Sequence, residues 1–249
     1  MISESNPQIL YYGDFFKQEG SIAVVLGNGF DLDLGYEMTY EGFAKSSFWP
    51  FKGNTDSSTL GGFLNGRVKK GWYDLEKGLY DFASIASYKD TIKDDFKALY
   101  ESLYDFLRSK KDCSLNENSC AFCLLQMLMY TGRNCKVFSF NYTDLLNIIG
   151  RTRNILRRME ELPQSTFIDS PETIDVINVH GRLYNRKIIV GTRDFPKVID
   201  GKSMGEWSFF SKATNPNYIS SQITGKLGDY EIVIFFGHSL SLNDFPYFK

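Results

Sequence analysis

The chain has 249 residues, of which 43% are hydrophobic and 16% aromatic, and its formal net charge is −2 at pH 7. This composition excludes an intrinsically disordered chain and a small disulfide-stabilised protein, and the length suits one large domain or two small ones. A net charge so close to zero gives no general attraction to phosphate backbones, which argues against a protein that coats nucleic acid.

The N-terminus and the cysteines indicate the compartment. The first ten residues have no basic segment followed by an apolar one, so we expect no signal peptide. The longest apolar stretch, 120–130, is shorter than the about 20 residues that span a bilayer. Within it Cys120 and Cys123 form a single CxxC, which we interpret as two core cysteines because a zinc site needs four ligands. We therefore expect a cytoplasmic protein with free thiols, no metal and no membrane segment.

Short apolar segments rich in β-branched residues predict the strands. They lie at 21–26, 136–140, 174–179, 187–190 and 231–236. Their near-continuous apolar character is typical of a sheet that is covered on both faces, which predicts an α/β fold with a mainly parallel sheet. The segment 180–191 is expected to form a hairpin-like excursion.

More than a hundred residues separate the first two predicted strands, far more than one crossover helix needs. Apolar residues at three- and four-residue spacing predict helices at 72–87 and 91–109. The buried stripe of the second helix is expected to consist of Phe96, Leu99, Leu103 and Phe106. The segment 50–71 lacks this periodicity and is expected to be a flexible loop over the site. We therefore expect a single domain, 1–249, that contains a helical insertion at 50–130.

A glycine-rich motif follows the first predicted strand. It consists of Gly27, Asn28, Gly29, Phe30 and Asp31. Glycines let the backbone approach a ligand, and the amides of a following helix can hold a phosphate. Leu32 stands where the dinucleotide fingerprint has its third glycine, so a hydride-transferring dehydrogenase is not expected. An Asn-Gly hairpin turn is the alternative, although the residues that follow favour a loop entering a helix.

Polar residues also follow the second strand, where open α/β sheets place their ligands. They are Asn141, Tyr142, Thr143 and Asp144. Capping of the following helix by Thr143 or Asn141 is the alternative, and both roles are compatible.

His180 follows the third strand and precedes a glycine. A lone histidine is often a structural residue, but this position places its imidazole at the same edge as the first two motifs. A general base that titrates near neutrality is useful there.

The last strand is followed by a turn that contains Gly237, His238, Ser239 and Ser241, with Asp244 close by. We interpret Ser239 as a ligand-binding residue and His238 as structural, and a helix start capped by Ser241 is the alternative. The motif lacks the pattern of a nucleophile elbow, so a serine hydrolase is not expected. The acidic residues of WYDLE, 72–76, are interpreted as favourable charges in a first helical turn.

In chain order, GNGFD, WYDLE, FNYTD, VHG and GHSLS with a nearby aspartate resemble the motifs of the AbiH family of bacterial abortive-infection, anti-phage proteins. The resemblance runs from about Leu26 to Asp244. The family's TY..F element is matched by Thr39, Tyr40 and Phe43. The resemblance implies a defence protein with a small nucleotide ligand and a phage or host protein as its trigger. Members of the family are expected to continue past position 249.

The same layout is similar, more distantly, to the sirtuin-like NAD-binding fold. That resemblance implies a Rossmann-like sheet with helices on both faces, and NAD as substrate or ligand. It implies that Gly27 and Gly29 face the dinucleotide phosphates, that Asn141 lies near the nicotinamide ribose and that His180 is the catalytic base. Because the chain has no four-cysteine zinc ribbon, cleavage of the nicotinamide–ribose bond is expected rather than deacylation.

On this hypothesis His180 takes a proton, Asn141 orients the ribose or water, and Asp31 or Asp144 stabilises the ribosyl cation. The nucleotide contacts are expected from the glycine-rich motif together with Gly237, Ser239 and Asp244. The alternative is a non-catalytic module that binds a nucleotide or ADP-ribose and acts through a partner. Nucleic acid and membranes are not expected as partners. Both a monomer and a homo-oligomer are compatible with the sequence.

Overall fold

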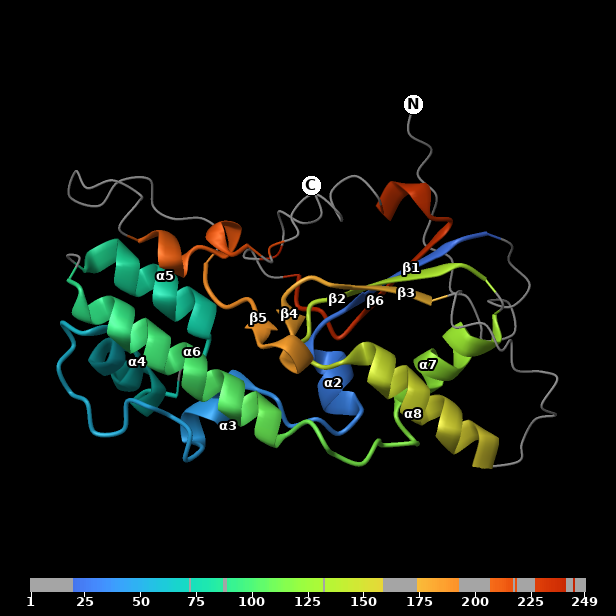
Figure 1. Ribbon diagram of the computed structural model, residues 1–249, viewed down its shortest axis with the longest axis horizontal. Helices are drawn as coiled ribbons and strands as arrows, with labels where there is room; N and C mark the ends of the chain where they lie inside the picture. The colour runs from blue at the N-terminus through green and yellow to red at the C-terminus, as the bar shows by residue number, and fades with distance from the viewer. Residues whose placement is uncertain are drawn as a thin grey trace.

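Four parallel strands form the main sheet of the computed structural model, in the order β3-β2-β1-β6 (Figure 1). The strands are β1 (Ile22–Leu26), β2 (Cys135–Ser139), β3 (Ile174–Asn178) and β6 (Ile232–Phe236). Each begins and ends within one residue of a predicted strand, and the α/β fold is confirmed. The structure describes residues 20–71, 73–86, 89–131, 133–158, 174–192, 207–216, 218, 227–240 and 244.

The central strand β1 is buried on both of its faces. Ile22, Val24 and Leu26 belong to the large core that includes the helices, whereas Ala23 and Val25 belong to a smaller cluster on the opposite face. In that smaller cluster the described covering residues include Leu227 and Tyr230, at the short turn η6 (Leu227–Asp229). Burial on both faces explains why the segment reads IAVVL without polar residues.

Helices α2 (Asn28–Asp33), α7 (Cys120–Tyr130) and α8 (Leu145–Arg158) pack together against the first face of the sheet (Figure 1). On α7 both Cys120 and Cys123 are exposed, so the prediction that they are core residues was wrong. The two cysteines are three residues apart and therefore share one side of the helix, while the other side carries its buried apolar residues.

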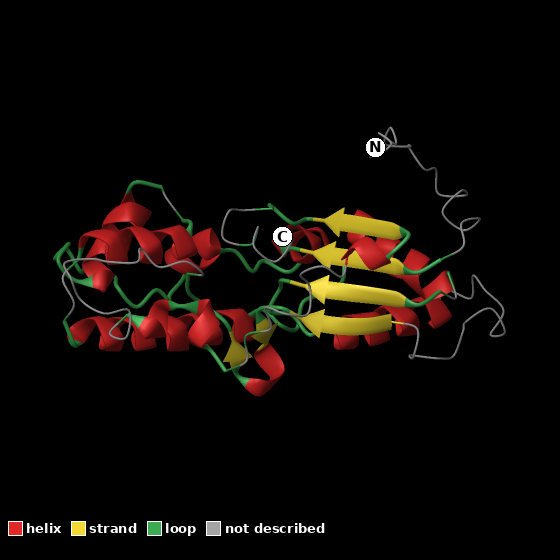
Figure 2. Cartoon of the chain, turned by 90° about the horizontal axis from the view of Figure 1, so that it is seen from above, coloured by secondary structure: helices red, strands yellow, loops and turns green. Residues whose placement is uncertain are grey.

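The long segment between β1 and β2 also forms a separate helical part. It contains α3 (Tyr40–Lys45), α4 (Leu60–Lys69), α5 (Leu75–Ile85) and α6 (Thr91–Ser109). Figure 2 shows these helices beyond the end of the sheet toward which the strand arrows point. On α6 the stripe predicted from the sequence is confirmed, with Phe96 partly buried and the other three residues fully buried. None of the described helices is long and apolar enough to cross a membrane.

The segment 50–71 was predicted to be a loop, and this was wrong for its second half, which forms α4. The helix begins after Thr59, whose Oγ1 accepts a hydrogen bond from the N–H of Gly62 at 3.1 Å. A Cβ atom on Gly62 would lie 2.1 Å from the carbonyl oxygen of Asp56. The glycines that suggested a loop therefore allow a helix to pack closely against the preceding turn.

After β3 the chain forms a small hairpin. Strand β4 (Gly181–Arg182) pairs antiparallel with β5 (Lys187–Ile188), and the short turn η3 (Leu183–Asn185) joins them. The predicted excursion at 180–191 is confirmed, but the predicted strand at 187–190 belongs to this hairpin and not to the main sheet. Gly181 makes the close pairing feasible, because its φ is +82° and a Cβ there would lie 1.5 Å from the carbonyl oxygen of Lys187.

Candidate functional site

A cavity of about 360 Å³ lies where the carboxyl ends of the strands face the helical part. Residues from the turns after all four strands of the main sheet line it. Beside β1 the order of the sheet reverses, since β2 and β3 lie on one side and β6 lies on the other. Open α/β sheets place their ligand crevice at such a point. The four strand-end motifs of the sequence therefore meet at one cavity.

The cavity brings together most of the site residues predicted from the sequence. Those that line it are Gly27, Asn28, Asp31, Asn141, His180, Gly237, Ser239 and Asp244. Phe30 is instead a core residue whose ring lies edge-on to that of Phe236 at 5.9 Å. Asp144 lines a second cavity, where its Oδ1 accepts a hydrogen bond from the N–H of Asn147 at 3.3 Å. The carboxylate of Asp144 therefore caps α8, the role that we had given as the alternative for Thr143 or Asn141.

The glycine turns after β1 and β6 pack directly against each other. Helix α2 begins right after Gly27, which excludes the hairpin alternative. The N–H of Gly29 donates to the carbonyl oxygen of Gly237 at 2.9 Å. A Cβ on Gly27 would lie 2.4 Å from the Cα of His238, and one on Gly237 would lie 2.2 Å from the backbone nitrogen of Phe30. These glycines thus permit close contact between two turns, while their expected role toward phosphates stays a prediction.

Asp31 is buried beneath the first glycine turn, with 1% of its surface exposed. Its Oδ1 accepts hydrogen bonds from Nδ2 of Asn141 at 2.9 Å and from Oγ1 of Thr143 at 3.1 Å. Burial raises the pKa of Asp31 to about 7, although both hydrogen bonds act to lower it. Asn141 also donates to the carbonyl oxygen of Gly27 at 2.9 Å. The side chain of Asn141 therefore fixes the glycine turn and Asp31 relative to β2.

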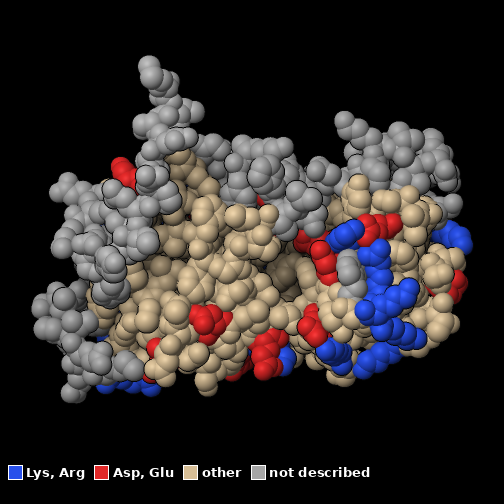
Figure 3. Space-filling model, turned by 180° about the vertical axis from the view of Figure 1, so that it is seen from behind, with Lys and Arg blue, Asp and Glu red and all other residues tan. Residues whose placement is uncertain are grey.

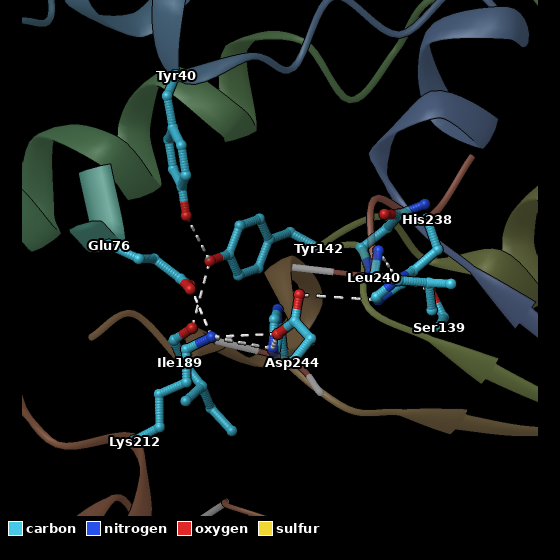
Figure 4. Close-up of polar contacts among 11 residues, drawn as sticks. Tyr40, Glu76, Ser139, Tyr142, Ile189, Lys212, His238, Leu240 and Asp244 are labelled. Carbon is cyan, nitrogen blue, oxygen red and sulfur yellow. Dashed lines mark hydrogen bonds and ion pairs between the residues drawn. The ribbon is translucent and has the colours of Figure 1, made fainter. Parts of the chain in front are cut away.

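A fully buried lysine joins the helical part to the edge of the sheet. Figure 4 shows Lys212 between two carboxylates, and its Nζ lies 2.7 Å from Oε1 of Glu76 and 3.7 Å from Oδ1 of Asp244. Glu76 belongs to the first turn of α5, whereas Asp244 follows β6. A buried charge is costly unless it is paired, so the lysine requires these carboxylates.

Lys212 was not among the site residues predicted from the sequence, and Glu76 was interpreted only as a favourable charge in a first helical turn. Asp74 does cap α5 as the charge pattern suggested, since its Oδ1 accepts from the N–H of Lys77 at 2.9 Å. Two residues later Glu76 turns to the cavity and to Lys212 instead. Only its place in the WYDLE motif could have drawn attention to Glu76, and no motif surrounds Lys212. Trp72 of the same motif lies outside the described residues.

Two groups that favour opposite protonation states of Nε2 of His180 lie near this atom. The Nζ of Lys212 lies 3.2 Å from it and Oδ1 of Asp244 lies 3.6 Å from it. An ammonium group donates and favours Nε2 without a hydrogen, whereas a carboxylate accepts and favours Nε2 with one. Burial acts to raise the pKa of Asp244, but the hydrogen bond from His180 and the charge of Lys212 hold that pKa well below its usual range. The wall of the cavity therefore contains an imidazole beside an ionised carboxylate.

Aromatic side chains complete this wall. The hydroxyl oxygens of Tyr40 and Tyr142 are 3.5 Å apart, and the Tyr142 hydroxyl donates to the carbonyl oxygen of Ile189 at 3.2 Å (Figure 4). Burial raises the pKa of both phenols, which therefore stay neutral. Phe140 also lines the cavity, and its ring lies edge-on to that of His180 at 5.3 Å.

His238, which we interpreted from the sequence as structural, also lines the cavity, and its Nε2 lies 3.7 Å from Oδ2 of Asp244. Its ring lies edge-on to Phe140 at 4.4 Å, and its Nδ1 accepts a hydrogen bond from the N–H of Leu240 at 3.0 Å. Burial lowers the pKa of His238, although the charge of Asp244 acts to raise it. The predicted cap residue Ser241 lies outside the described part of the chain.

The lining of the cavity is acidic. Its ionisable carboxyl groups belong to Asp31, Asp74, Glu76 and Asp244. No lysine or arginine is among the described residues that line it. Figure 3 shows acidic side chains beside the hollow between the two parts, while basic ones gather on the outer surface of the helical part. Within the described ranges no three His, Cys, Asp or Glu residues are arranged to hold a metal ion.

Comparison with known proteins identifies the family of the chain. A family model described as "Bacteriophage abortive infection AbiH" matches residues 23–249. No curated protein matches the chain, and no solved structure matches it either. The matched span includes all of the described residues that line the cavity. Because this span is nearly the whole chain, the protein belongs to the AbiH family of bacteriophage abortive-infection proteins.

Proposed function

We propose that the cavity binds the nicotinamide-riboside end of NAD and that the protein hydrolyses the bond between nicotinamide and ribose. The observation that carries this proposal is an acidic cavity at the carboxyl edge of a parallel sheet, with His180 in its wall. Cleavage of a common cofactor is also compatible with membership of an abortive-infection family.

The charge of the cavity matches the charge of this reaction. The nicotinamide ring of NAD is cationic, and its departure leaves positive charge on the ribose. An ionised Asp244 in a largely buried cavity stabilises such a charge more strongly than it would in water. The rings of Tyr40 and Tyr142 offer a further attraction for a cation. Asp144, which we had considered for this role, lines the second cavity instead.

The proposed step uses water as the nucleophile. The bond between C1′ of the ribose and the nicotinamide nitrogen breaks, and its electron pair leaves with nicotinamide, which becomes neutral. Water forms the new bond to C1′, and its proton passes to the imidazole of His180, which lines the cavity. The products are nicotinamide, ADP-ribose and one proton. Asn141 contributes by holding the glycine turn and Asp31 in place.

Chromatography of NAD incubated with the purified full chain tests the proposal. We expect nicotinamide release, and we expect His180→Ala and Asp244→Asn each to lower its rate by about 100-fold or more. Lys45→Met, in an exposed ion pair on α3, is the control that should keep the rate. Equal rates in the wild type and the His180 variant would overturn the proposed role of His180. Calorimetric binding of NAD with no release over hours would contradict hydrolysis and indicate a nucleotide-binding module.

A further inference from the structure

A second cavity, of about 600 Å³, lies next to the acidic one. Met38 lines both cavities. On α6 neighbouring residues divide between them, since Leu107 lines the first and Arg108 lines the second. Thr143 lines the second cavity and donates its hydrogen bond through the shared wall to Asp31 of the first. The two cavities are therefore neighbours along one surface.

The second cavity differs from the first in its charge. Among the described residues that line it, three have cationic side chains, namely Arg108, Lys111 and Arg186. Among the described residues no carboxylate forms an ion pair with Arg108 or Arg186.

Two carboxylates also line the second cavity, and both have partners. Asp112 lies 3.8 Å from the Nζ of Lys111, and Asp144 accepts the hydrogen bond that caps α8. The guanidinium groups of Arg108 and Arg186 can thus bind an anion in this cavity. Guanidinium groups bind phosphate oxygens with paired hydrogen bonds, so phosphate is the anion that this wall suits.

Aromatic rings accompany these cations. The guanidinium of Arg186 lies over the ring of Tyr104, 4.9 Å from its centre. In the hairpin turn Tyr184 also lines the cavity, and 87% of its surface is exposed. An exposed aromatic ring beside cationic side chains is a surface on which a base stacks.

We infer that the second cavity binds the phosphate-bearing, adenine end of a nucleotide, with Arg108 and Arg186 on the phosphates and Tyr184 against the base. The inference rests on the proposed function in one respect, namely that a single dinucleotide places its cationic end in the acidic cavity and its anionic end here. It assigns the phosphates to side chains rather than to the glycine turn, where the N–H of Gly29 already donates to Gly237.

Calorimetry on the full chain with two probes tests this assignment. ADP carries the phosphates and adenine, whereas nicotinamide riboside carries only the cationic end. We expect Arg108→Gln and Arg186→Gln each to weaken ADP binding about tenfold or more, and to leave the affinity for nicotinamide riboside unchanged. Tyr184→Ala should weaken ADP binding by a smaller factor. Lys97→Gln removes a cation from the same helix outside both cavities and serves as the matched control.

The outcomes separate this inference from the proposed hydrolysis. Undetectable ADP binding to the wild type, or equal affinities in the wild type and both arginine variants, would overturn the inference even if nicotinamide is released. ADP binding that depends on Arg108 and Arg186, in a protein that releases no nicotinamide, would support the nucleotide subsite and reject the hydrolysis. Circular dichroism spectra of the variants that match the wild type confirm that the changes act on binding rather than on folding.

Discussion

The ammonium nitrogen of Lys212 lies 3.2 Å from Nε2 of His180, and 0% and 7% of their respective surfaces are exposed. The lysine comes from a short turn, η5 (Lys212–Thr214), and the histidine follows β3. Glu76 and Asp244 complete the cluster, so that residues from four distant segments of the chain meet around one buried positive charge. The cluster therefore makes the helical part and the sheet depend on each other.

Removing the buried lysine should destabilise the fold strongly. Lys212→Met leaves the carboxylates of Glu76 and Asp244 without their buried countercharge, and we expect the free energy of unfolding to fall by about 3–5 kcal/mol. Urea denaturation followed by circular dichroism measures this change. The control, Lys45→Met, breaks an exposed pair with Glu41 and should cost less than about 1 kcal/mol. Similar midpoints for the two variants would show that the buried cluster does not support the fold.

The raised pKa of Asp31 predicts a stability that falls as the pH rises. Between an unfolded value of 3.8 and a folded value of about 7, the folded chain retains a proton that the unfolded chain releases. The free energy of unfolding should therefore decrease by up to about 1.4 kcal/mol per pH unit in this window. Asp31→Asn should remove this dependence, as measured by urea denaturation at a series of pH values.

The pKa shift of Asp244 predicts a pH dependence of stability opposite to that of Asp31. The pKa of Asp244 is lowered in the folded state, so its contribution to stability is present above pH 3.8 and is lost as the pH falls further. Asp244→Asn should therefore change how the free energy of unfolding depends on pH below about pH 4. It should leave unchanged the decrease in this free energy between about pH 4 and 7. If Asp31→Asn kept that slope, another group would be responsible for it.

The contact between the two glycine turns predicts a difference between two glycine-to-alanine changes. Gly237 and Gly53 both have positive φ, of +63° and +82°, but only Gly237 has backbone atoms where its Cβ would be. Gly53→Ala should cost about 1–2 kcal/mol, for the left-handed conformation alone. Gly237→Ala should cost more and should also weaken nucleotide binding, because Gly237 lines the acidic cavity. Thermal unfolding of both variants measures the difference, and equal losses would argue against the close contact.

The exposed side of α7 predicts which thiols react. In the folded protein Cys120 and Cys123 should be alkylated first by iodoacetamide, since both are exposed. Cys135 should be protected, because it is buried and its burial raises the pKa of the thiol. Peptide mass spectrometry after a short exposure tests this order, with the urea-unfolded chain as the control in which all four cysteines react. Fast labelling of Cys135 before Cys120 would contradict the structure.

Local patterns in the sequence were sufficient to predict the strands and the edge of the sheet at which the motifs lie. A buried parallel strand is apolar almost throughout, and IAVVL at β1 shows this plainly. Parallel strands end at one edge, so the residues after β1, β2, β3 and β6 had to lie near each other. The same patterns gave a wrong prediction at α4, because a glycine-rich segment that packs closely as a helix has the composition of a loop. They also gave a wrong prediction at Cys120, because the sequence of a largely apolar helix does not show which of its sides is exposed.

The sequence by itself thus determined the α/β class, the edge of the sheet at which the motifs gather and, through five motifs in order, the AbiH family. Only the tertiary structure decided which side chains share a cavity and how they are charged. Lys212 has no local pattern, and its partners Glu76 and Asp244 lie more than a hundred residues apart from each other. The electrostatics of a buried site depend on distance in space and on exclusion of water, and neither quantity can be obtained from spacing along the chain.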